Sequence, residues 1–69
     1  ASDMAQTLGE LDQQIALAHT KLNRQEMLLK TNVVSKAAVD ETRIQLDGYT
    51  KRRAELLESR VQPEVLRAP

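Results

Sequence analysis

The side chains that could do chemistry in this chain of 69 residues are few and scattered. His19 is the only histidine, there is no cysteine, and no glycine-rich loop is available to hold a phosphate. The neighbours of His19 one helical turn away, Ile15 and Asn23, are neither carboxylates nor thiolates. A solvated side chain therefore explains His19 better than a general base or a metal ligand does.

The carboxylates do not form an acid–base pair either. Asp40 and Glu41 are adjacent in sequence, so their side chains point in different directions on a helix. The basic run at residues 51–53 is followed at once by Glu55, which is typical of a solvated stripe and not of a nucleic-acid patch. We therefore predict that the chain is not an enzyme, has no catalytic or metal-binding residue and needs no cofactor.

Composition narrows the class of molecule further. Ten basic side chains balance ten acidic ones, and this neutral charge gives no support for binding to nucleic acid or to an anionic membrane. Tyr49 is the only aromatic residue, whereas a compact globule of this size normally needs more aromatic bulk. No apolar run is long enough for a membrane span. Good helix formers fill most of the chain, which predicts a few long helices with little loop.

The first long segment carries a heptad pattern. Its seam residues recur at spacings of three and four: Leu8, Leu11, Ile15, Ala18, Leu22, Gln25 and Leu29. A mean period of 3.5 residues is the seam of a coiled coil, and the positions between are mostly polar. The pattern predicts a helix over residues 4–30.

The heptad stops at residues 31–35, where β-branched residues and Asn together disfavour a helix. Ser35 is a good N-cap for a second helix, and Val34 and Val39 have the spacing of a hydrophobic staple. We expect the second helix over residues 36–62, because the residue before Pro63 disfavours the α region. Its seam is weaker and consists of Val39, Thr42, Leu46, Tyr49, Arg53, Leu56 and Arg60.

The two seams fit each other as an antiparallel pair. If the turn centres near residue 34, facing residues have numbers that add to about 68, so that Leu22 meets Leu46. Arg53 and Arg60 then have to lay their stems along the seam and lift their charged ends into water. The predicted fold is all-α, an antiparallel two-helix coiled-coil hairpin. Because one apolar stripe per helix is a small core, we expect isolated hairpins to be marginally stable and to self-associate.

Several side chains near the turn lie outside this seam. Leu28 lies beside the seam residue Leu29, and Arg24 is one turn earlier on the same face. Met27 adds another apolar side chain off the seam. The residues alone leave two interpretations open: a broadened core stripe with an ordinary N-cap, or an exposed apolar surface at the tip that binds a partner.

Arg24, Leu28 and Ser35, at spacings of four and seven, resemble the Arg-Leu-Ser motif of periplasmic adaptor proteins. These are the membrane fusion proteins of bacterial tripartite efflux pumps and type I secretion systems, and their motif lies at the tip of a helical hairpin. The surrounding residues 22–30, 33–36 and 39–40 also follow the tip pattern of that family. Residues 66–69, Leu-Arg-Ala-Pro, resemble the family's entry into the lipoyl domain after the hairpin.

The resemblance implies that the chain is a fragment of a larger, elongated adaptor. Residues 63–69 would form an extended exit towards a lipoyl-type domain that is not in this chain. The protein would be periplasmic, attached to the inner membrane, and joined to a transporter there through its other domains. Arg24, Leu28 and Ser35 would bind an outer-membrane channel protein tip to tip. Secondary contacts would come from the apolar tip residues Met27, Val33 and Val34.

The rival interpretation is a generic antiparallel coiled coil. It could be a structural spacer or an interaction arm of an unrelated protein, such as the RNA-binding arm of a synthetase. The neutral charge argues against the RNA-binding version. The spacer version predicts no partner at the tip, whereas the adaptor version predicts a channel protein there and export of drugs, metals or proteins.

Overall fold

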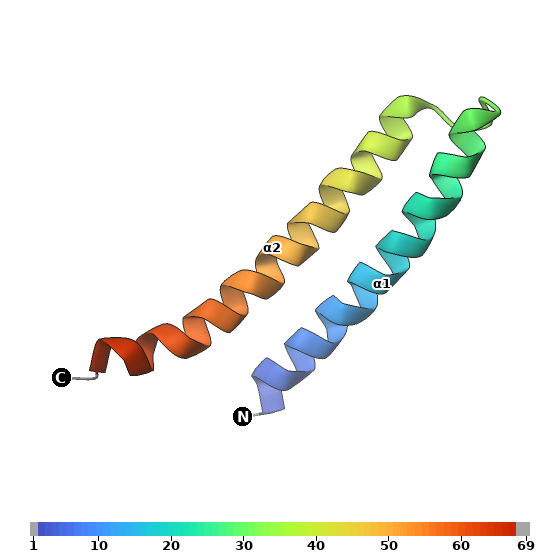
Figure 1. The fold of residues 1–69 in the computed structure, drawn as a ribbon. Helices are drawn as coiled ribbons and strands as arrows, with labels where there is room; N and C mark the ends of the chain where they lie inside the picture. Colours follow the sequence, from blue (N-terminus) through green and yellow to red (C-terminus); the bar gives the residue numbers. More distant parts are fainter. Residues whose placement is uncertain (1, 68–69) are drawn as a thin grey trace.

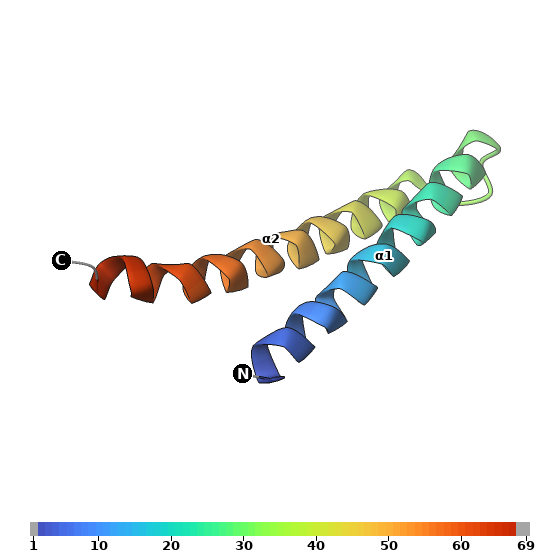
Figure 2. The same cartoon turned by 60° about the horizontal axis from the view of Figure 1, so that its bottom comes forward.

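The computed structural model describes the backbone of residues 2–67 and the side chains of residues 3–59. Within that range the chain forms two α-helices, α1 (Ser2–Lys30) and α2 (Lys36–Arg67), and no strand. The helices lie side by side and antiparallel, with both chain ends opposite the turn (Figures 1 and 2). The predicted all-α helical hairpin is therefore confirmed.

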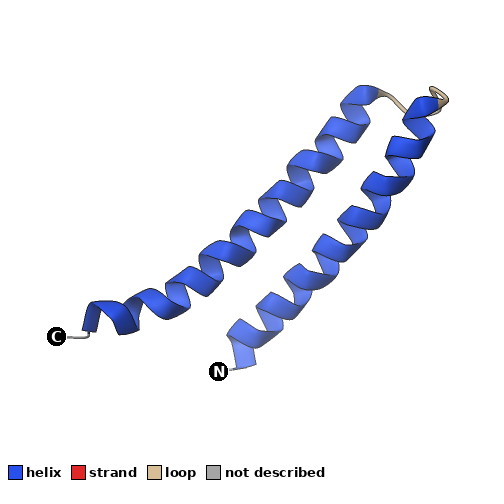
Figure 3. Ribbon diagram, in the orientation of Figure 1, coloured by secondary structure: helices blue, strands red, loops and turns tan. Residues whose placement is uncertain are grey.

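The molecule is an elongated rod that measures 58 × 22 × 12 Å. Within residues 2–67, only the short turn at the tip is not helical (Figure 3). α1 ends at Lys30 and α2 begins at Lys36, which are the residues between which the sequence places the turn. α1 begins at Ser2, slightly before the expected start at Met4.

The expectation that α2 ends at residue 62, just before Pro63, is wrong. The helix continues to Arg67, so residues 63–67 are helical and not an extended exit, and residues 68–69 lie outside the described part. Pro63 removes one amide donor, whose acceptor would be the carbonyl of Ser59, and Ser59 is exposed to water. The ring of proline also fixes φ near the helical value, which is compatible with the helical backbone of the residues after it. The last turns of α2, red in Figure 2, diverge from α1.

The core follows the predicted heptad seam. Leu11 and Ala18 of α1 and Val39 of α2 are the buried hydrophobic residues, and Val39 has no exposed surface. The other described seam residues are half-buried: Leu8, Ile15, Leu22, Gln25, Leu29, Leu46, Tyr49, Arg53 and Leu56. The predicted seam position Arg60 lies outside the described side chains. The burial pattern supports the coiled-coil character of the hairpin.

A buried hydroxyl in the seam of α2 is satisfied within its own helix. Thr42 is only 2% exposed, and its Oγ1 donates a hydrogen bond to the carbonyl of Ala38 at 3.2 Å. This bond removes the cost of burying an unpaired hydroxyl. Thr42 can therefore occupy a seam position that a fully apolar residue would otherwise fill.

Ion pairs between the helices report the register of the seam. Glu26 pairs with Arg43 at 2.7 Å, and Asp12 pairs with Arg53 at 2.6 Å. The residue numbers of these two pairs add to 69 and 65, close to the sum that the facing seams predict. Arg53 is half-buried, so its stem lies along the seam as expected, but its Nε meets a carboxylate of α1.

Val39 tests the core directly. Its full burial predicts that Val39→Ala lowers the free energy of unfolding by about 2 kcal/mol. Ile44 is the matched control on the same helix, because it is 72% exposed and Ile44→Ala should cost less than about 0.5 kcal/mol. Urea unfolding followed by circular dichroism measures both. Equal losses for the two variants would contradict the seam described above.

Candidate functional site

The end of α1 is closed by a left-handed residue. Asn32 has a φ of 59°, the conformation that helices often use just after their last turn. Its amide donates to the carbonyl of Leu29 at 3.0 Å, and the amide of Val33 donates to the carbonyl of Leu28 at 2.9 Å. These two bonds form a Schellman motif, which satisfies carbonyls that the helix end would otherwise leave without partners.

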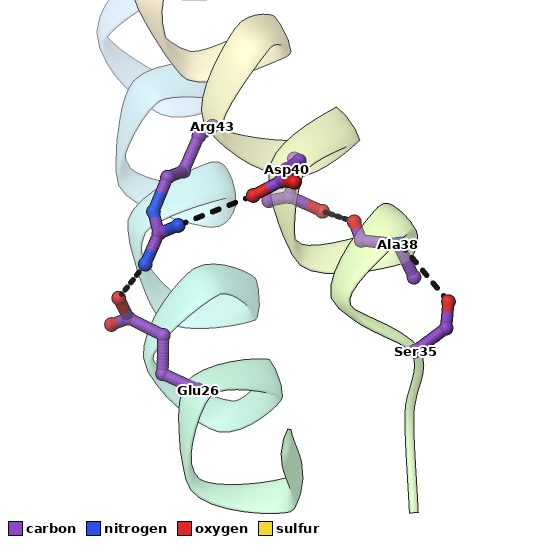
Figure 4. Close-up of polar contacts among 6 residues, drawn as sticks. Glu26, Ser35, Ala38, Asp40 and Arg43 are labelled. Carbon is purple, nitrogen blue, oxygen red and sulfur yellow. Dashed lines mark hydrogen bonds and ion pairs between the residues drawn. The ribbon is translucent and has the colours of Figure 1, made fainter. Parts of the chain in front are cut away.

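Ser35 caps the start of α2, as the sequence predicts. Its Oγ accepts a hydrogen bond from the amide of Ala38 at 3.1 Å, the third residue after the cap (Figure 4). The first helical bond runs from the amide of Val39 to the carbonyl of Ser35 at 3.3 Å. Val34, at the other end of the expected staple, is half-buried, and Val39 is fully buried. Local hydrogen bonds thus fix both helix ends at the tip.

An ion-pair cluster joins the two helices just below the turn. One guanidinium nitrogen of Arg43 donates to Glu26 at 2.7 Å, and the other donates to Asp40 at 3.4 Å (Figure 4). The side chains of Arg43 and Glu26 are 51% and 42% exposed, so water screens the pair. Such pairs contribute at most about 1 kcal/mol each. Their main effect here is to orient the first turns of α2 against α1.

The predicted tip residues of α1 differ in exposure. Arg24 is exposed and has no hydrogen bond or ion pair within the described residues. Met27 is 70% exposed, whereas Leu28 is half-buried. Arg24 and Leu28 are four residues apart on one helix, so they lie one above the other on one face. The helix therefore presents a guanidinium and an apolar side chain next to each other.

The turn adds further apolar surface to the tip. Val33 is 67% exposed and Val34 is half-buried. Ser35 is exposed, and its Oγ acts as the acceptor in the cap, so its O–H remains able to donate to another molecule. The six tip residues predicted from the sequence thus lie at one end of the rod, three in the last turns of α1 and three in the turn: Arg24, Met27, Leu28, Val33, Val34 and Ser35.

The arrangement of the tip is suited to recognition. The exposed groups of these six residues are two apolar side chains, one guanidinium and one hydroxyl, which resemble the anchors of a protein interface. His19 lies on α1 away from the tip, exposed and without a hydrogen-bond or ion-pair partner in the described part of the chain. Among the described residues, no three His, Asp or Glu side chains form a group that could hold a metal ion. Neither described helix combines the length and apolar composition needed to cross a membrane.

Two structural roles at the tip were missed from the sequence. The sequence pattern uses Asn32 only as a poor helix former, and its role as the left-handed residue that ends α1 was not predicted. Asn shortly after the last seam residue is a known signal for such a helix end. The pairing of Glu26 with Arg43 was also missed. The sequence contains a signal for this ion pair, because the antiparallel register places charged residues that flank the two seams opposite each other.

No protein-family model, curated protein or solved structure matches this chain.

The cap at Ser35 predicts a local loss of stability. Ser35→Ala removes the acceptor of the Ala38 amide and should lower the free energy of unfolding by about 1 kcal/mol. Ser35→Asp should retain most of the stability that the cap contributes, because Asp is also a good N-cap. Ser59→Ala is the control, since the Ser59 hydroxyl only bonds the carbonyl of Leu56 in its own helix. Equal effects of Ser35→Ala and Ser59→Ala in thermal melts would contradict the capping role.

The left-handed conformation of Asn32 gives a second prediction. Asn32→Gly should be tolerated, because glycine adopts a positive φ without a steric penalty. Asn32→Val should lower the free energy of unfolding by about 1–2 kcal/mol, because its Cβ crowds the backbone there. Circular dichroism melts of the two variants compare them directly. A Val variant as stable as the Gly variant would show that the turn does not need this conformation.

Proposed function

We propose that this chain is the hairpin of a periplasmic adaptor, which docks by its tip onto an outer-membrane channel protein. The adaptor bridges that channel to a transporter in the inner membrane for export of drugs, metals or proteins. The parent protein is attached to the inner membrane, and its domains outside this chain contact the transporter. The hairpin itself carries no catalysis, because the transporter supplies the energy.

One observation carries this proposal: the tip exposes interface-type side chains on a backbone that is fixed locally. Arg24 has no partner among the described residues, and Met27 is largely exposed. Neither side chain contributes much to the stability of the hairpin. The Schellman motif and the Ser35 cap nevertheless hold the surrounding backbone in one conformation. Pre-organised anchors of this kind lower the entropic cost of binding a partner.

Three tip residues have different roles in binding the channel protein. Arg24 donates hydrogen bonds to backbone or acidic groups of the partner, for which its five donors are suited. Leu28 fills an apolar notch between helices, and Ser35 keeps its cap while its O–H contacts the partner. This is recognition of helices through a few anchors.

Substitution of Arg24 or Leu28 by Ala tests the proposed docking. In the full-length parent, Arg24→Ala or Leu28→Ala should weaken docking about thirtyfold, which corresponds to about 2 kcal/mol. Arg24→Ala should leave the melting of the hairpin unchanged, because the side chain is exposed and unpaired. Leu28→Ala should cost about 1 kcal/mol of stability, since the side chain is half-buried, against about 2–5 kcal/mol for a buried leucine such as Leu11.

The readouts are export in Gram-negative cells and helix melting of the same variants. Lys51→Ala is the control, because Lys51 is exposed on α2 away from the tip. Lost export in Arg24→Ala with unchanged melting supports the adaptor. Unimpaired export in both tip variants would contradict it and favour a structural spacer.

A further inference from the structure

A second stripe, with two cations between two leucines, runs along α1 beside the seam. Leu17, Lys21, Arg24 and Leu28 follow one another at spacings of four, three and four, the same spacing as the seam itself. With the seam at heptad positions a and d, these four residues occupy positions c and g, and we call them the α1 flank. Leu17 is 70% exposed, Lys21 and Arg24 are exposed, and Leu28 is half-buried.

The two sides of the hairpin differ in how their charges are satisfied. Asp12 and Glu26, at position e on the other side of the seam, pair with arginines of α2. Lys21 and Arg24 have no ion pair within the described residues. No carboxylate lies three or four residues from either of them on α1. The α1 flank therefore carries two uncompensated positive charges between two leucines.

A groove lies along this side of the hairpin. Its volume is about 190 Å³, many times the ~10–15 Å³ that one water molecule needs. Leu17 and Lys21 line it from α1, and Gln45 and Tyr49 line it from α2. The groove thus continues the α1 flank away from the tip and offers space for an apolar side chain.

We infer that the α1 flank is a docking surface for one amphipathic helix that carries two acidic residues between two apolar residues at the same heptad spacing. The helix lays its apolar residues against Leu17, Leu28 and the groove, while its carboxylates meet Lys21 and Arg24. The inference rests on the proposed function in that Arg24 and Leu28 belong to both surfaces. It goes further by assigning Leu17 and Lys21 to the interface and by naming the chemistry of the partner.

The charges on the flank argue against a second copy of this chain as the occupant. In an antiparallel twofold pairing, Leu17 would face Leu28 of the other copy, but Lys21 would face Arg24. A parallel pairing would place each cation against itself. Like charges directly opposite each other across an interface oppose association, whereas carboxylates satisfy them.

Two synthetic helical peptides of about four heptads test the inference with the complete chain. On an Ala-Gln background, both carry four stripe positions with the spacing of the α1 flank and Leu at the two outer positions; one peptide carries Glu at the two inner positions and the other carries Lys. Fluorescence anisotropy should show that the Glu peptide binds at least about tenfold more tightly than the Lys peptide. Lys21→Glu should abolish this preference, because the α1 flank then carries one cation and one anion, and Leu17→Gln should weaken binding of the Glu peptide about tenfold.

Lys51→Glu is the matched control, because Lys51 is exposed on α2 outside the flank and should leave both affinities unchanged. Equal binding of the two peptides, or the same effect from Lys51→Glu and Lys21→Glu, overturns the inference. A dimer in sedimentation that Leu17→Gln dissociates also overturns it in favour of a second copy. The peptide assay contains no channel protein, so it tests the α1 flank separately from the proposed function. If the two peptides bind equally while the tip variants still impair export, only this inference is wrong. If the Glu peptide binds more tightly while the tip variants leave export unimpaired, only the proposed function is wrong.

Discussion

The reversal of the chain between Lys30 and Lys36 is the constraint on which the rest of the hairpin depends. The last carbonyls of one helix and the first amides of the next must both be satisfied within a few residues. Asn32 solves the first problem with a positive φ, and Ser35 solves the second with its hydroxyl. Once the turn is fixed in this way, the two heptad seams face each other and the register of the whole rod follows.

The register then decides how the polar groups are distributed. One side of the seam brings acidic residues of α1 to arginines of α2, whereas the other side leaves Lys21 and Arg24 without partners. The seam itself is not fully apolar: Thr42 is buried with a satisfied hydroxyl, but Oε1 of Gln25 is buried without a hydrogen-bond partner among the described residues. Polar residues in a seam reduce stability and help to specify one register. The hairpin thus has a thin core, a fixed register and unsatisfied groups along one flank and at the tip.

Features that depend on local sequence or on periodicity could be predicted. The seven seam positions of α1 define a helix and its buried face, and Ser35 followed by an apolar pattern defines the start of the next helix. The prediction that α2 stops before Pro63 fails for two reasons. The preference against a helical residue before proline is only a bias. The carbonyl that loses its amide partner is exposed and can bond to water instead. The Arg43 cluster depends on which side chains the register brings together, so it follows from the fold and not from any local motif. The exposure of Met27 and the pairing state of Arg24 likewise follow only from the assembled hairpin.

The proposed adaptor function requires that the tip, and not the outer face of α2, meets another protein. Met27 and Ile44 allow a direct comparison, because they are apolar and 70% and 72% exposed, respectively. A photoreactive amino acid at each position in the full-length parent, irradiated in intact Gram-negative cells, measures what each surface touches. The proposed adaptor function predicts a cross-link from position 27 to an outer-membrane channel protein and none from position 44. The same channel cross-linked from position 44, with none from position 27, would contradict it.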